Sequence, residues 1–134
     1  LMPLKKFALA ASRLTDGKIL NENTDIAKKI FNSCVNFPEI TGGTNSVNCI
    51  LTKLSKKKIF FKNGAEGLFL ALIPEIKSAL VVKILDGAAR AAETAIAGLI
   101  SELNIIDENE LAQIKSSEVT NSVGQKIGKM KFVL

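Results

Sequence analysis

The chain has 134 residues, a length typical of one domain, and 47% of them are hydrophobic. No apolar run approaches the ~20 residues that a membrane-spanning helix requires, so we expect no membrane span. The net charge of +5 comes mostly from lysines, but the chain has no tyrosine or tryptophan and its phenylalanines lie in apolar patterns, so we expect no surface that stacks nucleic-acid bases.

The cysteine and histidine content argues against a metal site within this sequence. There is no histidine, and the two cysteines, Cys34 and Cys49, lack a Cys-x-x-Cys spacing. Two cysteines in helical apolar patterns are expected to be buried free thiols rather than a disulfide framework. A reduced, cytoplasmic compartment fits this composition.

Two amphipathic helices are predicted at the start of the chain. The first begins at Pro3 and is stopped by Asp16-Gly17. The second covers 24–35 and ends before Pro38, because the residue preceding a proline avoids the helical conformation.

A glycine loop, Thr41-Gly42-Gly43-Thr44-Asn45, precedes a third predicted helix over about 45–55. Such a loop at a helix N-terminus can hold an anion such as a carboxylate. On the residues alone, a flexible connector with Thr44 as the helix N-cap is the favoured interpretation.

Short strands are predicted at 58–62, 67–73 and 79–85, followed by a helix over about 88–103 that Asp86 caps. The short connections favour an antiparallel meander. The middle strand is apolar on both faces, which predicts helices on each side of the sheet.

The remaining pattern predicts a shorter helix that starts at Asp107 and a half-buried final strand over Gly128–Leu134. The fold class is therefore α/β in the broad sense, more narrowly α+β. We expect an antiparallel sheet with helices packed on both faces in a single domain over 1–134.

Lys62 stands at the end of the first predicted strand and is followed by a turn that contains Gly64. The strand fixes the lysine backbone, the glycine permits close approach of a ligand, and the ammonium can face a carboxylate or an oxyanion. A Lys-Thr-Gly element of this shape lies beside the nucleophilic serine of β-lactamases and penicillin-binding proteins. Taken alone, however, Lys-x-Gly is more often a solvated strand end, and Glu66 is equally compatible with a site group and a polar turn residue.

Several segments together resemble one enzyme family. They are, in chain order, Met2-Pro3-Leu4-Lys5-Lys6-Phe7-Ala8, Pro38-Glu39-Ile40-Thr41-Gly42-Gly43-Thr44, Lys62-Asn63-Gly64-Ala65-Glu66-Gly67, Lys83 to Ala91, and Asn121 to Gly128. This set is similar to the signature of the thermolabile, rhizobial-type L-asparaginases, often labelled asparaginase II, whose fold resembles serine β-lactamases and glutaminases. The resemblance covers essentially the whole chain but only the second part of the family's length.

The resemblance implies hydrolysis of L-asparagine to L-aspartate and ammonia. It assigns Lys62 a catalytic role and implies that the substrate pocket is lined by Gly42, Gly43, Thr44, Gly64 and Glu66. The family's Ser-x-x-Lys nucleophile, its Asp-Gly-Cys-Gly segment and the ligands of its zinc would all lie upstream. We therefore expect a C-terminal portion that is inactive alone, has the missing N-terminal portion as a partner, and leaves a homodimer open.

Two other interpretations remain. A non-catalytic interaction domain, or a degenerate remnant of the enzyme, would bind a partner through an exposed apolar face. A β-lactamase or penicillin-binding relative is disfavoured by Ala65-Glu66-Gly67 and by the Asp-Gly-Ala-Ala-Arg segment from Asp86 to Arg90. Substitution of Lys62 distinguishes an enzyme from an interaction domain.

Overall fold

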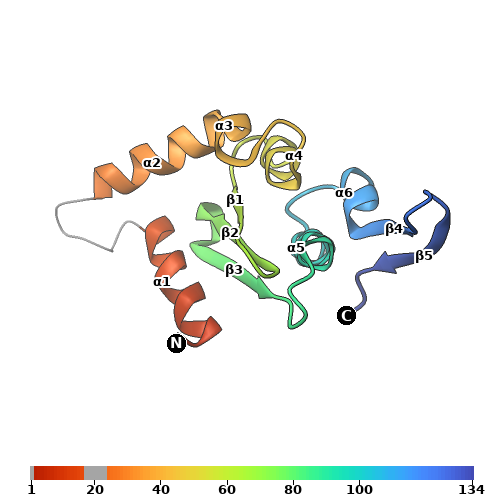
Figure 1. The fold of residues 1–134 in the computed structure, drawn as a ribbon. Coiled ribbons are helices and arrows are strands. Elements are labelled where there is room, and N and C mark those ends of the chain that lie inside the picture. Colours follow the sequence, from red (N-terminus) through yellow and green to blue (C-terminus); the bar gives the residue numbers. More distant parts are fainter. Residues whose placement is uncertain (1, 17–23) are drawn as a thin grey trace.

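The computed structural model describes residues 2–16 and 24–134. The helices in these ranges are α1 (Leu4–Asp16), α2 (Thr24–Asn36), α3 (Pro38–Gly42), α4 (Val47–Leu54), the short 3-10 helix η1 (Pro74–Ile76), α5 (Ala89–Glu102) and α6 (Glu108–Lys115). The strands are β1 (Phe60–Asn63), β2 (Leu68–Ile73), β3 (Ser78–Lys83), β4 (Ser116–Thr120) and β5 (Lys126–Lys131). The predicted α+β class is confirmed (Figure 1).

The larger sheet is the predicted antiparallel meander. Its strands lie in the order β1-β2-β3. Ala71 in the middle strand pairs with Phe61 of β1 and Leu80 of β3, so these three side chains share one face of the sheet.

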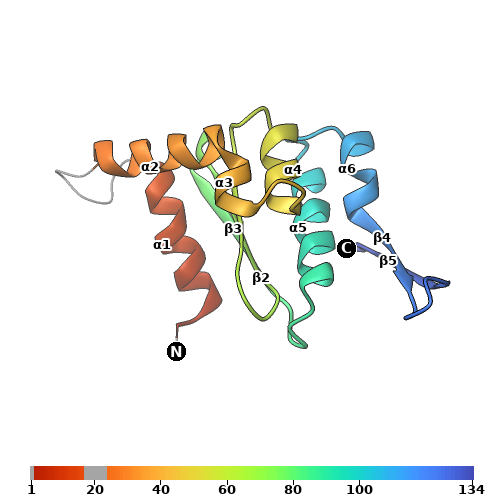
Figure 2. The ribbon, with the colours of Figure 1, turned by 45° about the horizontal axis from the view of Figure 1, so that its top comes forward.

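Helices cover both faces of this sheet, as the apolar middle strand predicted. Helix α1 packs on one face against β2 and β3, and α5 packs on the other (Figures 1 and 2). The core lies on the α5 side, where Phe61, Phe69 and Ala71 join Ile96 and Ile100, each at most 1% exposed. This packing fixes the end of β1, where Lys62 and Asn63 stand.

The segment before α4 differs from the prediction. Pro38 ends α2 and also opens the additional short helix α3, because a proline is well suited to the first helical position. The N-cap of α4 is Ser46 rather than Thr44: the Ser46 hydroxyl accepts a hydrogen bond from the Cys49 N–H at 3.2 Å. Thr44 is exposed in the connection.

The C-terminal strand also differs. It begins earlier than predicted and ends at Lys131, which pairs with Ser116, the first residue of β4. Met130 and Phe132 are partly buried, as the predicted alternation requires. No residue of β4 remains to pair with the chain beyond Lys131, and Leu134 is 84% exposed. The β4–β5 hairpin lies beyond α5, at the far side from the three-stranded sheet (Figure 2).

Both cysteines are free, with Cys49 buried as predicted and Cys34 only partly buried. No helix in the described ranges has the length and apolar character needed to cross a bilayer.

Candidate functional site

Lys62 and Asn63 form the end of the edge strand β1. Both are exposed, and the Lys62 ammonium donates to the Asn63 carbonyl oxygen at 3.2 Å and to Asn63 Oδ1 at 3.4 Å. The strand therefore holds a cation at its terminus with its charge turned toward a backbone and a side-chain oxygen.

A buried asparagine on α4 supports this end of the strand. Asn48 is only 3% exposed, and its Nδ2 donates to Asn63 Oδ1 at 2.8 Å. Asn48 was not among the residues predicted to form the site. It could have been found as an amide at helical spacing from Leu51 and Thr52, both of which are buried on the same helix.

Gly42 packs directly against the same asparagine. A Cβ atom placed on Gly42 would lie 2.9 Å from Asn48 Cβ and 2.8 Å from Ser46 Oγ, closer than real Cβ contacts allow. Gly43 has φ +91°, and a Cβ atom there would meet nothing within 4 Å. Gly42 is therefore needed for close packing, whereas Gly43 provides a left-handed backbone at an open position.

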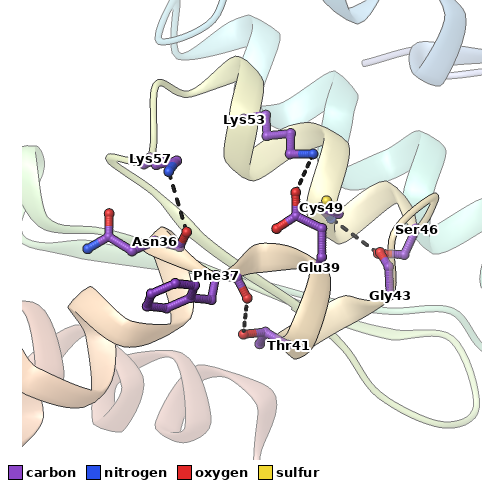
Figure 3. A network of polar contacts seen from close by, with 9 residues as sticks. All are labelled: Asn36, Phe37, Glu39, Thr41, Gly43, Ser46, Cys49, Lys53 and Lys57. Atoms are coloured by element: carbon purple, nitrogen blue, oxygen red, sulfur yellow. Dashed lines mark hydrogen bonds and ion pairs between the residues drawn. The ribbon is translucent and has the colours of Figure 1, made fainter.

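Polar contacts hold the glycine loop between α3 and α4 (Figure 3). The Ser46 hydroxyl donates to the Gly43 carbonyl oxygen at 3.0 Å while it accepts from the Cys49 N–H. Across the loop, Lys53 forms a 2.5 Å ion pair with Glu39. The hydrogen bond from Lys53 holds the pKa of Glu39 below its ordinary value, and the same bond raises the pKa of Lys53.

The turn after β1, residues 64–67, packs against the connection between β3 and α5 and not against the glycine loop. The Gly64 N–H closes the turn by donating to the Leu68 carbonyl oxygen at 2.8 Å. Glu66 has a left-handed backbone, φ +58°, and its Oε2 lies 2.8 Å from where a Cβ on Gly87 would be. Lys83 joins the two loops by donating to the Glu66 and Ile84 carbonyl oxygens at 2.5 and 2.6 Å.

The structure thus divides the residues that the sequence singled out. Lys62 is connected through Asn63 and Asn48 to Gly42 and the glycine loop. Glu66 lies instead against the β3–α5 connection. The close packing at Gly42 and the joined loops at Lys83 fall within the sequence segments whose pattern resembles a known family.

The family model of L-asparaginase II matches residues 1–132. The chain belongs to the L-asparaginase II family. A comparison with curated proteins finds no match.

One pair in this asparaginase family member has the Ser-x-x-Lys spacing of a serine nucleophile, Ser55 and Lys58. Ser55 is buried at the C-terminal end of α4, where its hydroxyl donates to the Thr52 carbonyl oxygen at 2.8 Å and accepts from the Ile59 N–H at 3.2 Å. Both hydrogen-bonding functions of this hydroxyl are occupied, so Ser55 terminates a helix and is not available as a nucleophile.

The family resemblance implies a zinc ion, but the described part of the chain contains no set of ligands for it. In residues 2–16 and 24–134, no group of three or more cysteine, histidine, aspartate or glutamate side chains could hold a metal ion.

Proposed function

We propose that these residues form the C-terminal portion of a rhizobial-type L-asparaginase, which hydrolyses L-asparagine to L-aspartate and ammonia. Membership of the L-asparaginase II family supports this proposal. The observation that carries it is the Lys62 ammonium, held by Asn63 at the end of β1 and joined through Asn48 to the Gly42 loop.

The proposed chemistry uses Lys62 beside a nucleophile from the upstream part of the enzyme. Hydrolysis of an amide needs an activated nucleophile and stabilisation of the oxyanion that forms on attack. The ammonium would either favour ionisation of the serine hydroxyl or hold the substrate in line. Gly42, Gly43 and Thr44 would line the pocket, and the exposed backbone at Gly43 would allow close approach of the substrate carboxylate.

Glu66 and Gly64 have a more indirect role in this proposal. They would shape the far side of the pocket by fixing the turn that follows Lys62. The Lys83 hydrogen bonds to the Glu66 and Ile84 carbonyl oxygens support that role, because they tie this turn to the loop that precedes α5.

Exposed apolar side chains on α1, α2 and α3 fit contact with the N-terminal portion. Leu9 on α1 and Ile30 on α2 are 54% and 60% exposed, and Ile40 on α3 is 85% exposed. Where such side chains form a contiguous patch, the patch usually marks contact with another polypeptide. The free thiols of Cys34 and Cys49 fit a cytoplasmic enzyme.

The test is ammonia release from L-asparagine by this chain mixed with the upstream portion of the same gene. Lys62→Ala in that mixture should lower turnover by at least about a hundredfold, since a positioned proton-transfer or charge-stabilising group contributes that much. Because Lys62 is exposed, the variant should keep the circular dichroism spectrum of the native chain. Unchanged turnover in a folded Lys62→Ala variant would exclude the proposed role.

These exposed apolar side chains also favour the second candidate, a non-catalytic interaction domain or remnant of the enzyme. In that case a partner would bind over α1 and α2, and Lys62→Ala would leave its binding unchanged. Leu9→Glu would weaken the binding, because it places a charge in the apolar contact. Absence of ammonia release with a folded upstream portion present would favour this candidate over the enzyme.

A further inference from the structure

Asn48 is an amide buried where an apolar side chain would be less costly. It is 3% exposed on α4, between the helix and the end of β1. Its Oδ1 has no hydrogen-bond partner among the residues that the structure describes. Burial of an amide with one unmet hydrogen bond costs free energy, so the presence of this residue calls for an explanation beyond packing.

The hydrogen bond that Asn48 does make selects one orientation of Asn63. Asn48 Nδ2 donates to Asn63 Oδ1, and the same oxygen accepts from the Lys62 ammonium. A carbonyl oxygen has two lone pairs and can accept both bonds. With the Asn48 amide as observed, an Asn63 amide turned over would place its NH₂ group against two other donors, so the observed orientation of Asn63 is the favoured one.

We infer that Asn48 is a positioning residue for Lys62. By acting through Asn63 it fixes the position of one of the two oxygens that the ammonium contacts at the end of β1, Oδ1, beside the Asn63 carbonyl oxygen. An exposed lysine otherwise samples many rotamers, and this sampling would disperse its charge over the surface. The inference rests on the proposed role of Lys62 in asparagine hydrolysis.

The glycine loop also packs against Asn48. Gly42 leaves room for only a hydrogen atom next to Asn48 Cβ and Ser46 Oγ. The position of the loop is thus transmitted through Asn48 and Asn63 to the ammonium. The loop and the lysine come from segments about twenty residues apart, and the asparagine pair is the polar link between them.

NMR on the 134-residue chain tests this link without any turnover. In Asn48→Ala and in Asn63→Ala, the order parameter of the Lys62 side chain should fall from its native value to below about 0.6, the range of a flexible group. Thr94→Val is the matched control, because Thr94 is also 3% exposed but lies on α5, and its hydroxyl has no hydrogen-bond partner within 2–16 and 24–134. It should leave the Lys62 signals unchanged.

Native Lys62 signals in a folded Asn48→Ala variant would overturn the inference. If Asn48→Ala does not fold, Asn63→Ala decides the question, because Asn63 is exposed and its side chain can be removed without opening the core. Native order of Lys62 in that variant would equally overturn it.

Kinetics on the chain mixed with the upstream portion supply a second readout. Asn48→Ala should lower kcat by up to about a hundredfold, as small misplacements of a catalytic group do, while KM changes little. The double variant Asn48→Ala with Lys62→Ala should be no slower than Lys62→Ala alone, because Asn48 acts only through Lys62. A double variant whose kcat is lowered by the product of the two single effects would contradict the inference.

Absence of ammonia release by the native mixture would defeat the proposed function, whereas NMR would still decide the role of Asn48.

Discussion

Gly42→Ala should destabilise the protein even though Gly42 lies in a helix, where alanine is normally preferred. The new Cβ atom would stand 2.8 Å from Ser46 Oγ and 2.9 Å from Asn48 Cβ, and neither atom is the free end of a long side chain. Overpacking of this kind costs about 1–3 kcal/mol. The gain from replacing glycine by alanine in a helix offsets at most about 1 kcal/mol, and less at a helix end. The net loss should be about 1–2 kcal/mol.

Thermal unfolding followed by circular dichroism measures this loss. For a domain of this size, about 1–2 kcal/mol corresponds to a decrease in Tm of roughly 3–10 °C. Gly43→Ala is the informative comparison, since its cost comes from a backbone at φ +91° and not from a contact. Only Gly42→Ala should shift the NMR signals of the Asn48 side chain. A Gly42→Ala variant with native Tm and native Asn48 signals would refute the packing argument.

Other predictions concern single polar groups. Lys83→Met removes the donor to two carbonyl oxygens and should lower the free energy of unfolding by about 1 kcal/mol in urea titrations; an unchanged midpoint would contradict this. Lys53→Met should raise the pKa of Glu39 toward its ordinary value in an NMR titration, and Lys57→Met should do so less, since Lys57 is the weakest cause. In the native chain the stability from this pair should be lost as pH falls through the lowered pKa of Glu39. Burial raises the pKa of Glu93, so its effect on stability is favourable at low pH and is lost as pH rises through that pKa. Glu93→Gln should therefore raise Tm at pH 7 but not at pH 3, and an equal change at both pH values would exclude burial of the charge as the cause.

Periodicity predicted the elements that bury a large apolar face. The apolar middle strand, 68–73, and the alanine-rich helix that became α5 both follow from residue spacing, and their packing confirms the α+β class. The sequence also predicted that Asp107 starts a helix. The structure confirms this, because the Asp107 carboxylate accepts a hydrogen bond from the Asn109 N–H at 2.8 Å.

The elements that were missed bury little surface or depend on a partner distant in sequence. Helix α3 is only five residues long. From sequence alone, Pro38 is equally compatible with the end of one helix and the start of another. Strand β4, Ser116–Thr120, is stabilised by its pairing with β5 and carries no apolar alternation of its own. Local patterns do not contain that information.

The candidate site was predictable only in part, because some of its residues depend on contacts with residues distant in sequence. Lys62 and the Gly42 loop could be selected from their segments, because lysine and glycine have recognisable uses at strand ends and loops. The helical spacing of Asn48 could have indicated that it is buried, but its link to Lys62 could not be predicted, since that link depends on a hydrogen bond to Asn63, fifteen residues away along the chain. The separation of Glu66 from the glycine loop likewise follows from tertiary packing against Gly87.

The central claim is tested most directly by ammonia release from L-asparagine, measured for this chain alone, for the upstream portion of the gene alone, and for the two together. We predict release only from the mixture, and its loss when the mixture contains Lys62→Ala. Release by the 134-residue chain alone, or equal release by the native and Lys62→Ala mixtures, would contradict the proposal that this chain supplies Lys62 to a composite asparaginase site.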